Sequence, residues 1–267
     1  MSSIRVSVAQ YAAGQDVNEN LQVATKLIKA AGEQADLVIL PENAMYADPT
    51  KKNPERNHSE ALDGSFVTSL SKAASSAGVD VVVGITETSD QDRPFNTLVH
   101  INAVGETAGV YRKIHLYDAF GYRESDKIVP ADITEPYIFE LNGVHVGLLT
   151  CYDLRFPEIT RWVVNGGADV VALPAAWAVG PAKELHWETL IRARAIENTI
   201  YFAASGQTGP HCTGQSMIAD PMGTVMACAG EGGAEFVTAE VNTSRIASVR
   251  ETNPSLDNRR FTISPVR

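Results

Sequence analysis

Short apolar runs alternate with amphipathic stretches along most of the chain. Residues 4–10, 36–42 and 79–87 are apolar, largely β-branched runs of strand length. Between them, the apolar residues over 17–31 and 64–77 recur with helical spacing, so these two segments are predicted helices. Strands that alternate with helices in this way are typical of α/β proteins.

The middle of the chain has the pattern of antiparallel hairpins instead. Residues 95–113 resemble two strands that turn at a Val-Gly pair, residues 104–105. Residues 137–149 contain Asn-Gly at 142–143, which is a strong signal for a two-residue hairpin turn. The sheet content is therefore predicted to be mixed.

The second half returns to alternating strands and helices. The pattern predicts a helix from Pro157 to the glycine pair at 166–167, strands over 168–176, 199–206 and 235–241, a helix over 182–198, and a turn at 221–223. No linker, repeat or low-complexity segment interrupts this order. Residues 1–267 are therefore predicted to form one α/β domain, although periodicity alone does not give the number of sheets.

The amino-acid composition argues against some classes of binding partner. The 267 residues are 44% hydrophobic and 20% charged, as in ordinary globular proteins. A net charge of −10 and a pI of about 5.1 argue against nucleic acid or an anionic membrane as partner. No apolar run approaches the roughly 18 residues of a membrane-spanning helix, and the N-terminus has no signal-peptide pattern.

The cysteines and histidines do not indicate a disulfide framework or a metal site. Three cysteines in a chain of 267 residues are too few for a disulfide scaffold, so a cytoplasmic, reducing location is expected. The six histidines lack metal-ligand spacing, and no glycine-rich phosphate fingerprint is present. We expect neither a metal nor a cofactor.

Three polar residues follow predicted strands. Glu42 follows the apolar run DLVILP, Lys113 follows GVYR, and Cys151 follows HVGLLT. In α/β folds, ligands collect at strand ends. A carboxylate can take up a thiol proton, and a lysine ammonium can stabilise an oxyanion. Each residue alone also has a plain interpretation, because most such residues are solvated loop side chains or inert thiols.

Three segments in this order resemble the signature segments of the nitrilase superfamily of carbon–nitrogen hydrolases: LPENAM, YRKIHLYD and CYDLRFPE. Residues 186–209 and 214–223 are similar to later segments of the family. The resemblance runs across nearly the whole chain. It implies a four-layer α-β-β-α sandwich that usually pairs as a dimer with extended sheets.

The resemblance also implies roles. Cys151 would be the nucleophile, Glu42 the general base and Lys113 the cation that stabilises the oxyanion. Glu124 matches a second glutamate of the family and would fix Lys113 and the substrate. The chain departs from the family in reading Pro-Ala-Asp at 130–132, where Pro-Gly-Asp is common.

Two further residues are candidates for the pocket. The backbone N–H of Tyr152 would complete an oxyanion hole, as in nucleophile elbows, and Trp177 would line the pocket or belong to the core. Lys113 is expected to favour the thiolate of Cys151 electrostatically. We expect charged neighbours to brace the elbow, and the other two thiols to be structural: Asp153, Arg155 and Glu158, with Cys212 and Cys228.

The predicted function is cysteine-dependent hydrolysis of a small amide through a thioester. Within the superfamily, CYDLRFPE and RARAIEN look more similar to the amidase branch, which includes omega-amidases and deaminated-glutathione amidases. A nitrilase, an N-carbamoyl amide hydrolase or a non-catalytic binding protein on the same fold are the alternatives. A cationic side chain near the pocket, with Arg155 and Arg194 as candidates, would favour an amide that carries a carboxylate.

Overall fold

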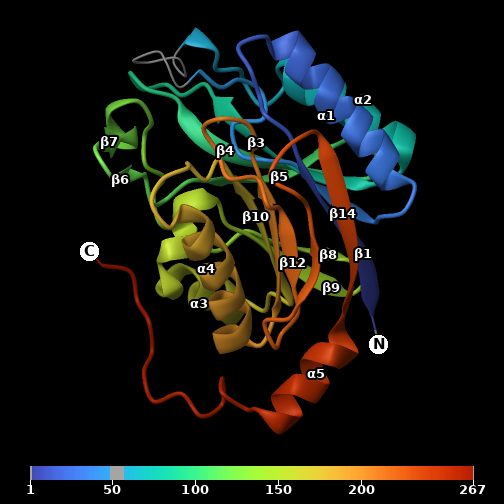
Figure 1. The fold of residues 1–267 in the computed structure, drawn as a ribbon, viewed down its shortest axis with the longest axis vertical. Coiled ribbons are helices and arrows are strands. Elements are labelled where there is room, and N and C mark those ends of the chain that lie inside the picture. The colour runs from blue at the N-terminus through green and yellow to red at the C-terminus, as the bar shows by residue number, and fades with distance from the viewer. Residues whose placement is uncertain (1, 49–56, 267) are drawn as a thin grey trace.

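A computed structural model of the protein describes residues 2–48 and 57–266, and Figure 1 shows its fold. Two six-stranded sheets form its centre. In spatial order the first contains β14 (Glu235–Asn242), β1 (Ser3–Gln10), β2 (Leu37–Ile39), β3 (Asp80–Glu87), β4 (Phe95–Ile101) and β5 (Thr107–Arg112). The second contains β13 (Val225–Cys228), β12 (Met217–Ala219), β11 (Tyr201–Gly206), β10 (Val170–Ala175), β9 (Val144–Leu148) and β8 (Ile138–Leu141).

Helices cover the outer face of each sheet (Figure 1). Helices α1 (Val17–Gly32) and α2 (Ser65–Ala77) lie on the first sheet, and α3 (Pro157–Asn165) and α4 (Lys183–Asn198) lie on the second. The fold is therefore the four-layer α-β-β-α sandwich that the resemblance implied.

The alternation of side chains along β3 shows how the layers form. Val82 points into the core between the sheets, whereas Val81 and Val83 pack under α1 and α2. All three side chains are buried, because a strand with a layer on each face has no solvent side. This is why the inner strands appear in the sequence as continuous apolar runs.

Local signals placed several elements correctly. The side chain of Asp16 accepts hydrogen bonds from the N–H groups of Asn18 and Glu19, which caps the start of α1. Asn142 and Gly143 both have positive φ, as a type I′ turn between β8 and β9 requires.

Several short or polar elements were not predicted. They are α5 (Thr243–Thr252), the small hairpin of β6 (Asp118–Ala119) and β7 (Tyr122–Arg123), and the short 3-10 helices η2 (Glu124–Asp126) and η3 (Cys151–Arg155). In α5 only Ile246 and Val249 are buried, so its sequence carries almost no apolar stripe. The strand predicted over 36–42 has only three residues in the sheet, because the chain leaves it before Glu42.

The topology brings distant strand ends to one region. Strands β1, β2 and β3 are parallel, and so are β9, β10 and β11. Two antiparallel steps, from β3 to β4 and from β4 to β5, return β5 to the direction of β3. The carboxyl ends of β2 and β5 in one sheet therefore lie near those of β9 and β10 in the other.

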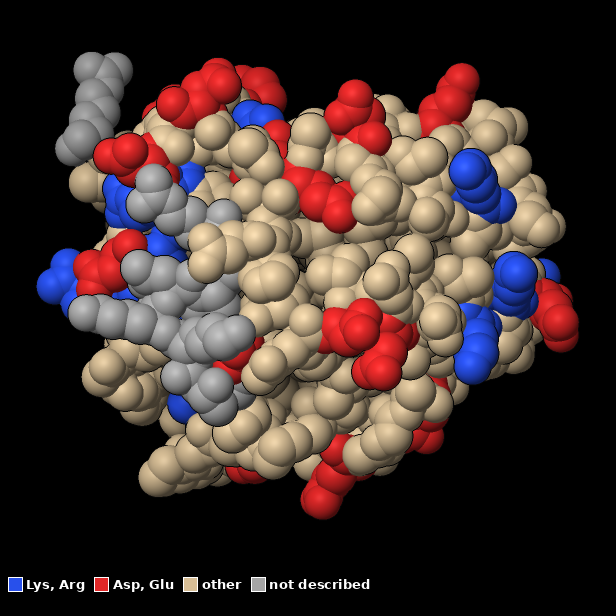
Figure 2. All heavy atoms as spheres, turned by 90° about the horizontal axis from the view of Figure 1, so that it is seen from above, with Lys and Arg blue, Asp and Glu red and all other residues tan. Residues whose placement is uncertain are grey.

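The surface reflects the acidic composition. Figure 2 shows carboxylates spread across one face, whereas the lysine and arginine side chains drawn there lie toward its two sides. Across residues 2–48 and 57–266, the helices are too short or too polar to span a bilayer.

Candidate active site

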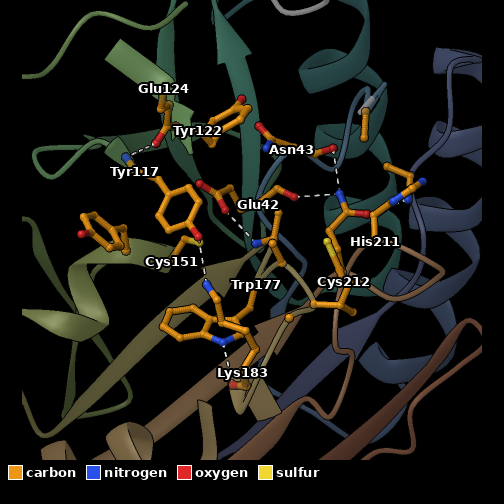
Figure 3. A pocket seen from close by; sticks show the side chains of 18 of the residues that line it. Glu42, Asn43, Tyr117, Tyr122, Glu124, Cys151, Trp177, Lys183, His211 and Cys212 are labelled. Atoms are coloured by element: carbon orange, nitrogen blue, oxygen red, sulfur yellow. Dashed lines mark hydrogen bonds between the residues drawn. The ribbon is translucent and has the colours of Figure 1, made fainter. Parts of the chain in front are cut away.

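A cavity of about 750 Å³ opens where these strand ends meet, a size typical of small-molecule sites (Figure 3). All six candidate residues line it: Glu42, Lys113, Glu124, Cys151, Tyr152 and Trp177. The first four have buried side chains. The interpretation of Glu42, Lys113 and Glu124 as solvated loop residues is therefore wrong.

Cys151 occupies a sharp turn just after β9. Its φ is 46°, a left-handed conformation that is rare for residues other than glycine and that often marks functional turns. Cys151 is the first residue of η3, which Thr150 caps through a reciprocal capping box with Asp153. The turn therefore directs the thiol away from the sheet and into the cavity.

Asp153 holds this turn against the segment that carries Lys113. Its carboxylate, which is fully buried, accepts hydrogen bonds from the Tyr111 hydroxyl at 2.6 Å and the Thr150 N–H at 3.0 Å. It also contacts Nδ1 of His115 at 2.8 Å. Because Tyr111 and His115 flank Lys113, one carboxylate fixes both groups. The expectation that Asp153 braces the elbow is confirmed.

Glu42 lies between the sheets with both oxygens engaged. Oε1 accepts hydrogen bonds from Lys113 at 2.8 Å and Asn96 at 2.7 Å, and Oε2 accepts from the N–H of Ala176 at 2.7 Å. A side chain at Gly84 would place its Cβ 2.5 Å from Cα of Glu42, so only glycine permits this approach. The carboxylate has a fixed orientation.

Lys113 is held by two carboxylates. Its Nζ lies 2.8 Å from Glu42 and 2.9 Å from Glu124. Glu124 also accepts a hydrogen bond from the N–H of Tyr117 at 2.6 Å, and Asn96 donates to it at 3.0 Å. Although its neighbours in sequence are polar, Glu124 turns inward at the start of η2. The predicted contact between Glu124 and Lys113 is confirmed.

The charges of these groups are strongly coupled. Burial, together with the neighbouring Glu42 carboxylate, raises the pKa of the Cys151 thiol well above its ordinary value, and Lys113 offsets only part of this. Burial alone would raise the pKa of Glu42, but Lys113 and hydrogen bonds from Cys151 and Asn96 lower it. Burial opposes the charge of Lys113, yet Glu124 and Glu42 raise its pKa well above the usual value.

Lys113 does favour the thiolate, as expected, because its charge lowers the pKa of the Cys151 thiol, but burial and Glu42 outweigh this effect. The raised pKa of the Cys151 thiol and the lowered pKa of Glu42 both favour a protonated sulfur beside an ionised carboxylate. A free thiolate would place a second negative charge beside that carboxylate in a buried site.

Two residues of the site were missed in the sequence. Asn96 on β4 bridges Glu42 and Glu124 through one amide nitrogen. Gln207 follows β11 and donates to the backbone oxygens of Glu42 and Asn43 at 2.8 and 3.0 Å. The only available signal was an amide within or directly after an apolar strand, which is too common to identify a site.

The remaining candidates differ in their positions. Tyr152 is in the first turn of η3, where backbone N–H groups have no helical acceptor. Trp177 is both a core and a pocket residue, and its indole N–H donates to the backbone oxygen of Lys183 at 2.9 Å. Arg194 instead bonds to Leu154 and Glu197, outside the residues that line the cavity.

The other two thiols are not in similar surroundings. Cys212 lines the cavity, and burial raises the pKa of its thiol to about 12. Cys228 is exposed on β13. Among residues 2–48 and 57–266, no cluster of three side chains suited to a metal ion occurs. The arrangement at Cys151 is that of a nucleophile with an adjacent acid–base group and an adjacent cation.

Known proteins share this fold and much of this sequence. The sequence model of the carbon–nitrogen hydrolase family matches residues 5–251. A deaminated glutathione amidase of Escherichia coli is 37% identical over 257 residues, which is 96% of this chain and 97% of that protein. A deaminated glutathione amidase of Synechocystis is 33% identical and covers 98% of this chain and its own full length. The crystal structure of Saccharomyces cerevisiae Nit3, a member of branch 10 of the nitrilase superfamily, superposes with a TM-score of 0.85 at 30% identity and covers 97% of each chain.

Proposed function

Since the chain belongs to the carbon–nitrogen hydrolase family, and is an amidase-type enzyme of it, we propose that it hydrolyses a small amide through a thioester on Cys151. The observation that carries this proposal is the position of the thiol. Cys151 lies in a strained turn beside Glu42, whose carboxylate also accepts a hydrogen bond from the ammonium of Lys113.

In the acylation step, the sulfur of Cys151 attacks the amide carbon while Glu42 accepts the thiol proton. The carbon–sulfur bond forms, and negative charge develops on the carbonyl oxygen. The ammonium of Lys113 and the N–H of Tyr152 stabilise that oxygen. As the carbon–nitrogen bond breaks, Glu42 returns its proton to nitrogen, and ammonia or an amine leaves.

In the deacylation step, Glu42 takes a proton from a water molecule that attacks the thioester carbon. The carbon–sulfur bond then breaks, the sulfur regains a proton from Glu42, and a carboxylic acid is released. One carboxylate serves both steps because its orientation is fixed by Asn96, Lys113 and Ala176. Glu124 holds Lys113 from its other side.

Deaminated glutathione is our first candidate substrate, because two full-length relatives bear names that state activity on it. Nitriles and N-carbamoyl amides are the competing classes. The test is a panel of deaminated glutathione, simple amides, nitriles and N-carbamoyl compounds, with release of the dipeptide amine measured for the first and release of ammonia for the others. Turnover of nitriles alone, or of none of these compounds, would contradict it.

Glu124→Gln is expected to lower kcat/KM by about tenfold or more, since it removes a charge-assisted contact that positions Lys113. Glutamine keeps the shape, so Cys151 should react with iodoacetamide at nearly the wild-type rate. Both rates are measured on the purified variant. Wild-type turnover would return Glu124 to a structural role and leave Glu42, Lys113 and Cys151 as the reacting set.

The pH profile should show the lowered pKa of Glu42. A lowered pKa means that the base becomes protonated only at lower pH, so kcat/KM should persist below the ordinary glutamate range. Asn96→Leu removes one hydrogen bond that stabilises the carboxylate, so its acid limb should move toward neutral pH. Coincident acid limbs in the two proteins would exclude Glu42 as the titrating base.

The domain organisation, the oligomeric state and the location of the protein are also proposals. Residues 1–267 would act as one domain, as a homodimer, in a cytoplasmic, reducing compartment that keeps Cys151 usable. The proposed partner is a small amide and neither nucleic acid nor a membrane, because the net charge is −10. Light scattering of the purified protein tests the dimer.

A further inference from the structure

One buried amide joins strand ends of the two sheets beside the cavity. Gln207 directly follows β11, lines the cavity and is only 3% exposed. Its Nε2 donates hydrogen bonds to the backbone oxygen of Glu42 at 2.8 Å and to that of Asn43 at 3.0 Å (Figure 3). Its Oε1 accepts a hydrogen bond from the N–H of Ala13 at 2.7 Å. One side chain of the second sheet therefore holds two segments that follow strands of the first.

The backbone turns sharply at Glu42. The next residue, Asn43, has a φ of 54°, in the left-handed region, and β2 has ended before it. Side chains donate to the carbonyl oxygens of this turn: Gln207 bonds to the first two, and the Tyr11 hydroxyl donates to that of Ala44 at 2.8 Å. A buried carbonyl group without a donor is costly. Gln207 therefore stabilises the conformation that presents Glu42 to the cavity.

Gln207 contacts the backbone of Glu42, whereas the carboxylate of Glu42 has donors of its own. Those three donors lie 2.7 to 2.8 Å from the carboxylate oxygens. The carboxylate also interacts with the thiol of Cys151. A general base must lie within hydrogen-bond reach of the proton that it takes up, and a misplacement of about 1 Å can lower a rate by about 10²-fold. A shift of the turn would move the carboxylate relative to all these partners at once.

A second buried amide provides a matched comparison. Gln10 is fully buried on β1; its Nε2 donates to the backbone oxygen of Gly230 at 2.9 Å, and its Oε1 accepts from the N–H of Ser216 at 3.0 Å. Like Gln207, it links the two sheets, but it lies outside the residues that line the cavity. Loss of Gln10 should therefore have a similar cost in stability without moving the turn at Glu42.

We propose that Gln207 is a positioning residue for the general base. By fixing the backbone of Glu42 and Asn43, it holds the Glu42 carboxylate within reach of Cys151. This inference rests on the proposed function, in which Glu42 exchanges protons with the thiol and with water. Gln207 acts through Glu42 and not on the substrate, so its loss should affect kcat much more than KM.

The first test is Gln207→Met, which keeps the size of the side chain and removes the donor. It should lower kcat by about 10- to 100-fold and leave KM almost unchanged. Gln10→Met, the matched control, should lower the unfolding temperature to a similar extent and keep wild-type kcat. In enzyme that already carries Glu42→Gln, Gln207→Met should cause little further loss, because the two residues act as a unit. Gln207→Asn, which withdraws the amide by one methylene, is a milder variant and should give a smaller loss of kcat.

A measurement without substrate separates this proposal from the proposed function. The carboxylate of Glu42 raises the pKa of the Cys151 thiol, so a displaced carboxylate should raise it less. The pH profile of iodoacetamide alkylation at Cys151, followed by peptide mass spectrometry, should therefore move to lower pH in Gln207→Met and stay in place in Gln10→Met.

Three results would each overturn the positioning role of Gln207. They are an unchanged alkylation profile in Gln207→Met, an equal fall of kcat in Gln207→Met and Gln10→Met, and an undiminished effect of Gln207→Met in the Glu42→Gln enzyme. Failure of the proposed function differs from these, because the wild type would then hydrolyse no amide while the alkylation profiles still reported the position of Glu42. Thermal unfolding of each variant verifies that it is folded.

Discussion

Cys151→Ala is expected to lower kcat by about 10⁴-fold or more, as for nucleophiles that act in a unit with their base. Neither other thiol is expected to substitute, because Cys228 is exposed on β13 and Glu42 interacts through its side chain with Cys151 rather than with Cys212. The fold should persist, since Thr150 and Asp153 hold the turn without the sulfur. Ammonia release and thermal unfolding on the same preparation measure the two effects.

Cys228→Ala is the control for Cys151→Ala, because it removes a thiol outside the cavity. It should retain wild-type turnover and stability. If Cys151→Ala hydrolysed amides within tenfold of the wild-type rate, the nucleophile would have to be assigned elsewhere. Mass spectrometry of wild-type enzyme stopped during turnover should find the acyl group on the peptide that contains Cys151.

Glu42→Gln should lower kcat by about 10²- to 10⁴-fold, the range that general bases contribute. Glutamine keeps the shape and can still contact Asn96 and Lys113, but it cannot accept the thiol proton or activate water. The substitution should also lower the pKa of Cys151, because the carboxylate beside the thiol is one of the groups that raise it. The variant would be slower although its thiol ionises more easily.

Two measurements separate these effects in Glu42→Gln. Steady-state turnover gives the loss of the base, and ultraviolet titration of the thiolate gives the shift in the Cys151 pKa. Glu140→Gln, on the exposed side of β8, removes a carboxylate far from such contacts and should change neither quantity. Slow turnover with an unchanged thiol pKa would contradict the close electrostatic coupling of Glu42 and Cys151.

Much of the fold could be predicted from local pattern. The period of apolar residues identified the long helices, and the Asn-Gly pair identified the β8–β9 hairpin, because these signals lie within a few residues. The small β6–β7 hairpin and α5 were not predicted, because each buries too few side chains to give a periodic pattern of apolar residues. The number of sheets depends on contacts between strands that are distant in sequence, so local pattern did not give it. Only the family resemblance predicted two sheets.

The residues of the site could be predicted from the sequence, but the pKa shifts of their side chains could not. Glu42, Lys113 and Cys151 were found because each follows an apolar strand and lies in a recognisable motif. Arg123 and Asp126 made the surroundings of Glu124 look solvated, yet its side chain turns inward to Lys113. The raised pKa of the Cys151 thiol depends on burial and on Glu42, which is distant in sequence.

Lys183 lines the cavity and was not predicted, for a related reason. Near the N-terminus of a helix and beside Glu184, it resembles an ordinary exposed lysine. Its burial results from the β6–β7 hairpin and from the aromatic rings of Tyr117 and Trp177. The burial of such a lysine can be recognised only when its spatial neighbours are known.

The position of the cavity has a consequence for folding. Glu42 and Lys113 extend from the first sheet and Cys151 from the second, so neither half of the sandwich contains the proposed catalytic machinery alone. Enzymatic turnover would therefore report the docking of one sheet on the other. If the chain were cut between β7 and β8, each fragment alone would be inactive. Turnover should return only when the two fragments are combined.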